Sequence, residues 1–495
     1  MIERFTFDRL CTALLFVAIA TAACLMPAQH DTWWLLRAGQ DIWHTRQVLL
    51  TDIYSHTAYG AAWPNHEWLS QLLFYAIYAI GGMPLLTLAA AAAVTAAWAI
   101  VWIETRGPAQ AKFLMTAFVV ATATTTWSLR AQVLSLLLVV ATAALLRRRR
   151  YVWLPLLFWI WANLHGAVLL GVLLLAAALA AAIVEDRKAI LRLAGATASC
   201  LVATALTPLG WRFWLDMPQS LGRIRQLGID EWAAPAVGSL AEAPFWITIA
   251  ALIVLTCARG RMLFDGEARR EGRITQCACA LALAPLALTA VRNVPPFLML
   301  SLPAIAALLP GFPTARVASA PQRPRLNFAF AAAAAALAAV VVAGAYHARL
   351  ARFNWVPLPP ASIAALDRCE GNLYNRYDEG GYLIWFAPGR KVFLDGRQDP
   401  YPPSLINEQK LVEASGIFER LFARYDVGCA YVPAESAVSA NLARAGWTPL
   451  FSDPNWAVFA RNRESLVTQP YKAAPRDLIL DLQVSADDSG QIVGR

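Results

Sequence analysis

Residues 10–71 read LCTALLFVAIATAACLMPAQHDTWWLLRAGQDIWHTRQVLLTDIYSHTAYGAAWPNHEWLSQ, and this stretch decides the fold class. Its first part, 10–26, is apolar and follows Arg4 and Arg9, a pattern shared by signal peptides and first membrane helices. We expect a retained helix because the chain that follows is itself rich in apolar runs. The second part, 29–67, is polar, which predicts a large loop outside the membrane.

The rest of the chain repeats this alternation. Hydrophobic residues make up 58% of the sequence and charged residues only 15%, far from the average of soluble proteins. Apolar runs close to the length of a membrane span recur as far as Ala345 and then stop. The sequence therefore predicts a mainly α, polytopic membrane helix bundle of about 10 to 12 spans, followed by a C-terminal mixed α/β extracytoplasmic domain.

The basic residues indicate which side of the membrane each loop faces. A net charge of +9 could suit nucleic-acid binding, but the arginines cluster at the ends of apolar runs, as at Arg147 to Arg150. Cytoplasmic loops carry such clusters, so we expect membrane topology and no nucleic-acid partner. We predict a multi-pass protein of the bacterial inner (plasma) membrane. Its expected parts are a membrane domain (1–346) with external loops 29–67 and 209–244, and a soluble periplasmic domain (347–495).

The segment 68–146 leaves the number of spans open. It contains four apolar runs, but an odd number of crossings is needed to bring Arg147 to the cytoplasm. One run is therefore expected to be re-entrant or to lie at the membrane surface.

The C-terminal domain is expected to mix strands with short helices. Gly380–Gly381 favours a tight turn, and strands are expected at 391–394, 427–432 and 456–460. Cys369 and Cys429 form one disulfide if the domain lies in an oxidising compartment, and otherwise remain free thiols.

The first external loop concentrates side chains that can perform chemistry. A carboxylate there could act as general base, taking a proton from an acceptor hydroxyl or amine. The candidate catalytic residues are Asp31, Asp52 and Glu67. Asp31 is favoured because it follows the first helix by a few residues, which would place it at the water boundary.

Histidines and tryptophans of the same loop have two interpretations each. His30 and His56 are candidate ligands of a divalent metal, although HExxH is absent and no cofactor is certain. Trp33 and Trp34 would line a sugar or lipid path, or anchor a helix at the membrane surface.

A phosphate on a lipid carrier would need cations at the outer membrane surface. Arginines that only snorkel to ordinary headgroups are the alternative. The candidate substrate-binding residues of the bundle and first loop are Arg37, His66, Arg130, Arg292 and Asn293. In the soluble domain, Asp378, Asp395, Arg397 and Asp399 could hydrogen-bond a sugar or peptide. His165, inside an apolar run, is expected to make an interhelical hydrogen bond or to face a cavity between the helices. Asp230–Trp232 could complete that cavity.

The motifs HDTWWLLRAGQDI, TDIYSHTAYG and WPNHEWLSQ resemble the first loop of a bacterial branch of the GT-C superfamily, the polyprenyl-phosphate-sugar-dependent glycosyltransferases that include protein mannosyltransferases. The resemblance implies that the catalytic carboxylate is Asp31. The stretch NRYDEGGYLIWFAPGRKVFLDGRQDPY (375–401) resembles the region around the WWDYG motif of oligosaccharyltransferase catalytic subunits. Its paired tryptophans are absent, so binding of a peptide sequon is not implied.

The function implied is transfer of a sugar, with inversion, from a polyprenyl-phosphate-linked donor in membrane lipid to an extracytoplasmic glycan, lipid or protein acceptor. Two other classes remain open. A membrane transporter or lipid flippase would often show paired broken helices in two matching halves, and the sequence suggests none. A non-catalytic envelope-assembly protein would need neither the loop carboxylates nor the arginines of the apolar runs.

Overall fold

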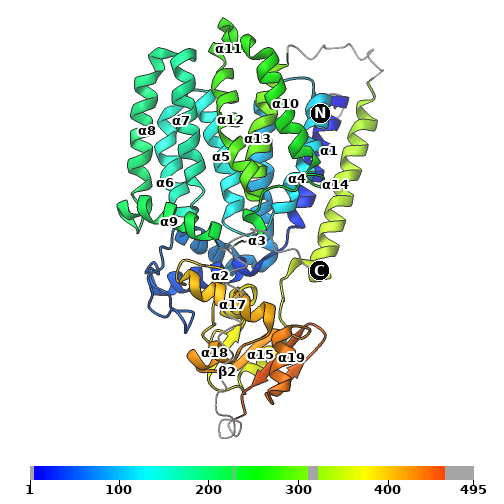
Figure 1. The fold of residues 1–495 in the computed structure, drawn as a ribbon. Coiled ribbons are helices and arrows are strands. Elements are labelled where there is room, and N and C mark those ends of the chain that lie inside the picture. The colour runs from blue at the N-terminus through cyan, green and yellow to red at the C-terminus, as the bar shows by residue number, and fades with distance from the viewer. Residues whose placement is uncertain (1–4, 227, 229, 310–321, 463–495) are drawn as a thin grey trace.

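The computed structural model describes residues 5–226, 228, 230–309 and 322–462. Within them the chain forms a bundle of long helices with a smaller domain below one end (Figure 1). The last part of the predicted periplasmic domain, after residue 462, lies outside the described residues. The predicted class, a membrane helix bundle with a C-terminal α/β domain, is confirmed.

Apolar helices stand side by side in the bundle (Figure 1). They are α1 (Phe7–Cys24), α3 (Trp68–Glu104), α4 (Ala109–Ala123), α5 (Gln132–Arg147), α6 (Leu154–Leu164), α7 (Val168–Glu185), α8 (Ile190–Thr204), α10 (Ala243–Arg259), α12 (Arg273–Thr289), α13 (Val294–Leu308) and α14 (Pro324–His347). Six of them are long and apolar enough to cross a membrane: α1, α3, α7, α10, α13 and α14. Helices α5, α6 and α12 are apolar but shorter. The expected total of spans stays a prediction.

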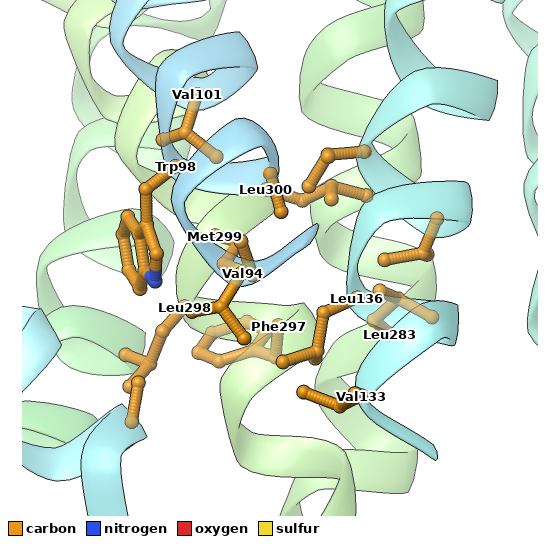
Figure 2. Close-up of a cluster of buried hydrophobic side chains, with 14 of the residues drawn as sticks. Val94, Trp98, Val101, Val133, Leu136, Leu283, Phe297, Leu298, Met299 and Leu300 are labelled. Atoms are coloured by element: carbon orange, nitrogen blue, oxygen red, sulfur yellow. The ribbon is translucent and has the colours of Figure 1, made fainter. Parts of the chain in front are cut away.

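Helix α13 is the centre of the bundle. Every residue from Val294 to Leu308 is buried, as expected for a helix that is apolar on all sides. Its residues Phe297 to Leu300 pack against Val94, Trp98 and Val101 of α3, with side chains of α5 and α12 on the other side (Figure 2). Helix α13 packs in this way against α3, α4, α5, α10 and α12.

Helix α3 consists of two parts separated by a kink at Gly81–Gly82, where the backbone leaves helical geometry. The first part, 68–80, lies along α2 (His30–Thr45), because Tyr75 contacts both Trp43 and His44. The second part runs through the core to Glu104, which pairs with Arg147 at the far end of α5. Which of the four apolar runs in 68–146 is re-entrant or lies at the membrane surface stays a prediction.

The basic clusters gather at the end of the bundle opposite the C-terminal domain. Arg149 lies 3.0 Å from Asp186 and donates a hydrogen bond of 2.9 Å to the carbonyl oxygen of Arg269. That carbonyl belongs to the short helix α11 (Gly266–Arg270), which Figure 1 shows at the far end from the sheet domain. The charged loops are thus separated from the polar first loop by the length of the bundle.

The C-terminal domain has a four-stranded mixed sheet in the order β1-β2-β4-β3. Strands β1 and β2 are parallel, and the other neighbours are antiparallel. The strands are β1 (Asn372–Asn375), β2 (Val427–Pro433), β3 (Thr448–Ser452) and β4 (Trp456–Ala460). Five helices cover the sheet: α15 (Pro360–Leu366), α16 (Tyr377–Phe386), α17 (Pro403–Ser415), α18 (Glu419–Arg424) and α19 (Ala437–Arg444). A disulfide joins Cys369, just before β1, to Cys429 in β2.

Two local predictions for this domain are wrong. Gly380 and Gly381 are not in a turn but inside α16, where both glycines are buried. The run 391–394 is not a strand within the sheet. Only Val392 forms a bridge, and its partner is Ser55 of the first loop. In both places contacts with the first loop replaced the local preference.

Helix α2 lies between the bundle and the C-terminal domain, and glycines permit both contacts. A Cβ on Gly39 would lie 2.0 Å from the carbonyl oxygen of Gln71 in α3. A Cβ on Gly381 of α16 would lie 2.2 Å from the carbonyl oxygen of His30 in α2. The backbones approach so closely that no larger residue fits at either position.

We expect Gly39→Ala to destabilise the protein by about 3 kcal/mol, the upper end for an overpacked site, because its methyl group would collide with rigid backbone. Thermal unfolding in detergent measures the change. Gly344→Ala in α14 is the control, since a Cβ there meets no atom within 4 Å. Equal melting temperatures for the two variants would contradict the close approach of α2 to α3.

Candidate active site

A cavity of about 350 Å³ lies where the bundle meets the C-terminal domain. Its wall combines the start of α2, the segment before α3, several connections between bundle helices and the turn that follows Asp395. The predicted site residues that line it are Asp31, Trp34, His66, Glu67, Arg130, Arg292, Asn293 and Arg397. Leu169, Leu170, Met217 and Leu286 form an apolar side. The cavity therefore offers charged groups beside a surface that suits a hydrocarbon.

Asp31 lies in the first turn of α2, where the free N–H groups of the helix end favour a carboxylate. Its Oδ1 accepts a hydrogen bond of 2.9 Å from Trp34 Nε1 and lies 3.3 Å from His30 Nε2. Its Oδ2 lies 3.2 Å from Arg130 Nη1. Burial alone would raise the pKa of Asp31, but the charges of His30 and Arg130 and the hydrogen bonds outweigh it and lower the pKa. Asp31 is therefore ionised at neutral pH.

Arg130 joins Asp31 to a second carboxylate, Glu231 of the outer segment η6 (Asp230–Trp232). Arg130 Nη2 lies 2.7 Å from Glu231 Oε2, and Arg292 Nη1 lies 3.3 Å from Glu231 Oε1. Burial would lower the pKa of Arg130, but Asp31 and Glu231 together raise it. Two guanidinium groups thus face one cavity, and guanidinium groups pair well with phosphate.

Glu67 is another carboxylate of the cavity and lies between two histidines. Its Oε1 is 3.7 Å from His66 Nε2 and 3.4 Å from His165 Nε2. Burial raises the pKa of Glu67; the charge of His66 opposes this shift, and the charge of Asp31 adds to it. The pKa values of Asp31 and Glu67 are therefore displaced in opposite directions. Such a pair can divide the roles of proton acceptor and proton donor.

Hydrogen bonds fix which nitrogen of His165 carries the proton. Trp161 Nε1 donates to Ser135 Oγ at 2.8 Å, and an indole N–H can only donate. The backbone N–H of Ala167 donates to His165 Nδ1 at 3.4 Å, so this nitrogen is an acceptor, and the Ser135 hydroxyl, 2.9 Å away, donates to it as well. Burial lowers the pKa of His165 well below its ordinary value, so the ring is neutral. Its remaining proton is on Nε2, the nitrogen that faces Glu67.

Arg397 connects the first loop to the C-terminal domain inside the protein. Its side chain has no exposed surface, and its Nη2 lies 2.6 Å from Asp52 Oδ1 and 2.7 Å from Asp395 Oδ2. Its guanidinium also lies 4.9 Å from the ring centre of Tyr54 and 4.7 Å from that of Trp63. Of these three residues only Arg397 lines the cavity, and the carboxyl groups of Asp52 and Asp395 are fully buried.

The other predicted residues have partners outside the cavity lining. Arg37 Nε donates to Asp41 at 3.1 Å, and His56 Nε2 donates to the carbonyl oxygen of Leu373 at 2.9 Å. The ring of Trp33 is buried and packs against other aromatic rings. The functional roles predicted for these residues stay predictions.

Asp399, which the sequence also named as a possible hydrogen-bonding partner of a sugar or peptide, lines the cavity as well. It accepts a hydrogen bond of 2.6 Å from Ser220 in α9 (Phe213–Gln226). Among the described residues, no group of three His, Cys, Asp or Glu side chains is arranged to hold a metal ion. A divalent metal stays a prediction.

Solved structures share this fold over most of the chain. ArnT from Cupriavidus metallidurans, bound to undecaprenyl phosphate, matches with a TM-score of 0.52 and 13% identity, over 93% of this chain and 99% of ArnT. The oligosaccharyltransferase of Archaeoglobus fulgidus, tethered to an acceptor peptide, matches with a TM-score of 0.53 and 14% identity, over 92% and 74%. The same archaeal enzyme, AglB, in complex with an inhibitory peptide and dolichol phosphate, matches with a TM-score of 0.52 and 12% identity, over 93% and 75%.

No protein-family model and no curated protein sequence matches the chain. The likeness is therefore one of fold, shared with ArnT and the archaeal oligosaccharyltransferase over most of this chain.

The raised pKa of Glu67 predicts the pH dependence of Glu67→Gln. Folded Glu67 keeps its proton to a higher pH than the unfolded chain. Protonated Glu67 therefore contributes to the stability of the folded wild type fully below the ordinary pKa of 4.5. This contribution is lost as the pH rises through the raised pKa, because ionised Glu67 is buried in the folded state. Glutamine does not titrate, so the variant should melt at a higher temperature near pH 7. The difference, about 1.4 kcal/mol for each pKa unit, should shrink toward pH 4.5.

Thermal unfolding across this pH range measures the difference. Glu435→Gln, at an exposed carboxyl, is the matched control. If Glu67→Gln follows the control at every pH, the raised pKa of Glu67 is contradicted.

Proposed function

We propose that this chain is a membrane glycosyltransferase that moves a sugar from a polyprenyl-phosphate donor to an acceptor outside the cytoplasm. The observation that carries the proposal is the position of Asp31, whose carboxylate faces the same cavity as Arg130 and Arg292. The acceptor attacks the donor sugar while the lipid phosphate leaves. The base that activates the acceptor must therefore lie near the site that holds the phosphate. The ArnT and AglB structures, which hold undecaprenyl phosphate and dolichol phosphate, support a lipid-linked donor of this kind.

The proposed reaction is a single displacement at the anomeric carbon of the donor sugar. Asp31 takes the proton of an acceptor hydroxyl or amine as the acceptor oxygen or nitrogen bonds to that carbon. The bond from carbon to phosphate oxygen breaks on the opposite side, and its electrons stay on the phosphate. Arg130 and Arg292 stabilise the charge that develops there. One attack from the opposite face inverts the configuration.

Donor binding would also make Asp31 a better base. In the structure, the charge of Arg130 helps to lower the pKa of Asp31. A donor phosphate that pairs with Arg130 offsets part of that positive charge, so the pKa of Asp31 rises toward the value that favours proton transfer. The base would then be strongest when the donor is in place.

The proposed location is the bacterial inner membrane, with the C-terminal domain in the periplasm. The basic clusters lie at the end of the bundle away from that domain, as positive cytoplasmic loops would. The disulfide between Cys369 and Cys429 suits an oxidising compartment. The acceptor is then an extracytoplasmic glycan, lipid or protein.

Replacing Asp31 with Asn should lower sugar transfer by about 1,000-fold, because Asn keeps the shape but cannot take a proton. The measurement uses purified protein with a labelled polyprenyl-phosphate sugar and follows the release of polyprenyl phosphate. Asp367→Asn, at an exposed carboxylate after α15, is the control and should keep full activity. Full activity of folded Asp31→Asn would remove Asp31 as the base. No turnover by the wild type with any such donor would favour a transporter or an assembly protein.

A further inference from the structure

Glu231 pairs with both cavity arginines at once. Its Oε2 lies 2.7 Å from Arg130 Nη2, and its Oε1 lies 3.3 Å from Arg292 Nη1. A phosphate held by the same two guanidinium groups would use two of its oxygens in the same way. The carboxylate of Glu231 and a donor phosphate therefore require the same place.

The charges of the cavity give this overlap an energetic consequence. Two guanidinium groups, on Arg130 and Arg292, are paired with two carboxylates, on Asp31 and Glu231. An anion that entered while Glu231 kept both contacts would meet two arginines whose positive charges are already offset by these carboxylates. A phosphodiester carries one negative charge, as the Glu231 carboxylate does. Replacing the carboxylate by the phosphodiester therefore leaves the net charge around the two arginines unchanged.

Neighbouring contacts hold the arginines and the backbone in place during such an exchange. The guanidinium of Arg292 stacks on the ring of Trp232, 4.4 Å from its centre. The backbone N–H of Val291 donates to the carbonyl oxygen of Ala233 at 2.9 Å, which ties the outer segment to the start of α13. Rotation of the Glu231 side chain alone could therefore uncover both guanidinium groups.

We propose that Glu231 is an internal carboxylate of the donor site that competes with the donor phosphate for Arg130 and Arg292. This inference rests on the proposed function. Glu231 lowers the affinity for every polyprenyl phosphate, product included, and so prevents the site from retaining the carrier after transfer.

The test measures binding and does not depend on turnover. Farnesyl phosphate, a short isoprenoid phosphate, is titrated into the purified full-length protein, and tryptophan fluorescence or calorimetry gives the dissociation constant. We expect Glu231→Gln to bind farnesyl phosphate about tenfold more tightly than the wild type does. This gain corresponds to a wild-type site that Glu231 leaves free about one tenth of the time. Farnesol should bind no more tightly to the variant than to the wild type.

Three further variants make the result specific. Asp216→Asn removes one carboxylate charge from α9, the helix before η6, and should bind as the wild type does. Glu231→Ala should reproduce the gain, and it replaces Glu231→Gln if that variant unfolds. Glu231→Gln combined with Arg292→Gln should lose the gain, because one of the two uncovered guanidinium groups is gone.

Two results would overturn the inference in different ways. If the wild type binds farnesyl phosphate and both Glu231 variants bind it equally or more weakly, Glu231 only supports the arginines, and the proposed glycosyltransferase function survives. If neither wild type nor variants bind farnesyl phosphate, the arginine pair is no phosphate site. The donor side of the proposed function then fails as well.

Discussion

The arrangement of the whole protein depends on the close approach of three helices at α2. Gly39 brings α2 against α3, and Gly381 brings α16 against α2, each at a distance that only glycine permits. Gly396 permits a third close approach, because a Cβ there would lie 2.5 Å from Asp31 Oδ1. The cavity is therefore not a gap between two independent domains. Its first wall, the N-terminus of α2, is fixed by the bundle on one side and by the C-terminal domain on the other.

A buried ion network acts with this packing. Arg397 forms ion pairs with Asp52 of the first loop and Asp395 of the C-terminal domain, so both buried carboxylates have a partner. Removing one partner of such a network commonly costs about 3 to 5 kcal/mol, because a charge remains buried without compensation. The geometry gives Asp52 a role in joining the two parts, whereas Asp31 and Glu67 face the cavity.

The sequence predicted the class of fold because a membrane imposes a strong pattern: long apolar runs, basic ends and polar external segments. It also placed Asp31, Glu67, Arg130 and Arg292 among the candidate residues, since charged groups beside apolar runs are rare. It could not pair Arg130 with Glu231, because their 101-residue separation is closed only by tertiary packing. The turn expected at Gly380–Gly381 failed for a related reason: a glycine needed for close approach looks the same in sequence as one needed for a turn.

The position of α2 has a consequence for how the protein is made. α2 is translated before most of the bundle helices, but its partner α16 follows after them, and the hydrogen bond from Trp33 to Asn354 spans 321 residues. Contacts between distant parts of a chain form late in folding. Asp31 thus remains without its C-terminal wall until the domain that carries α16 has been synthesised and folded. A ribosome-bound or truncated chain without that domain would hold the carboxylate and the arginines but no complete cavity.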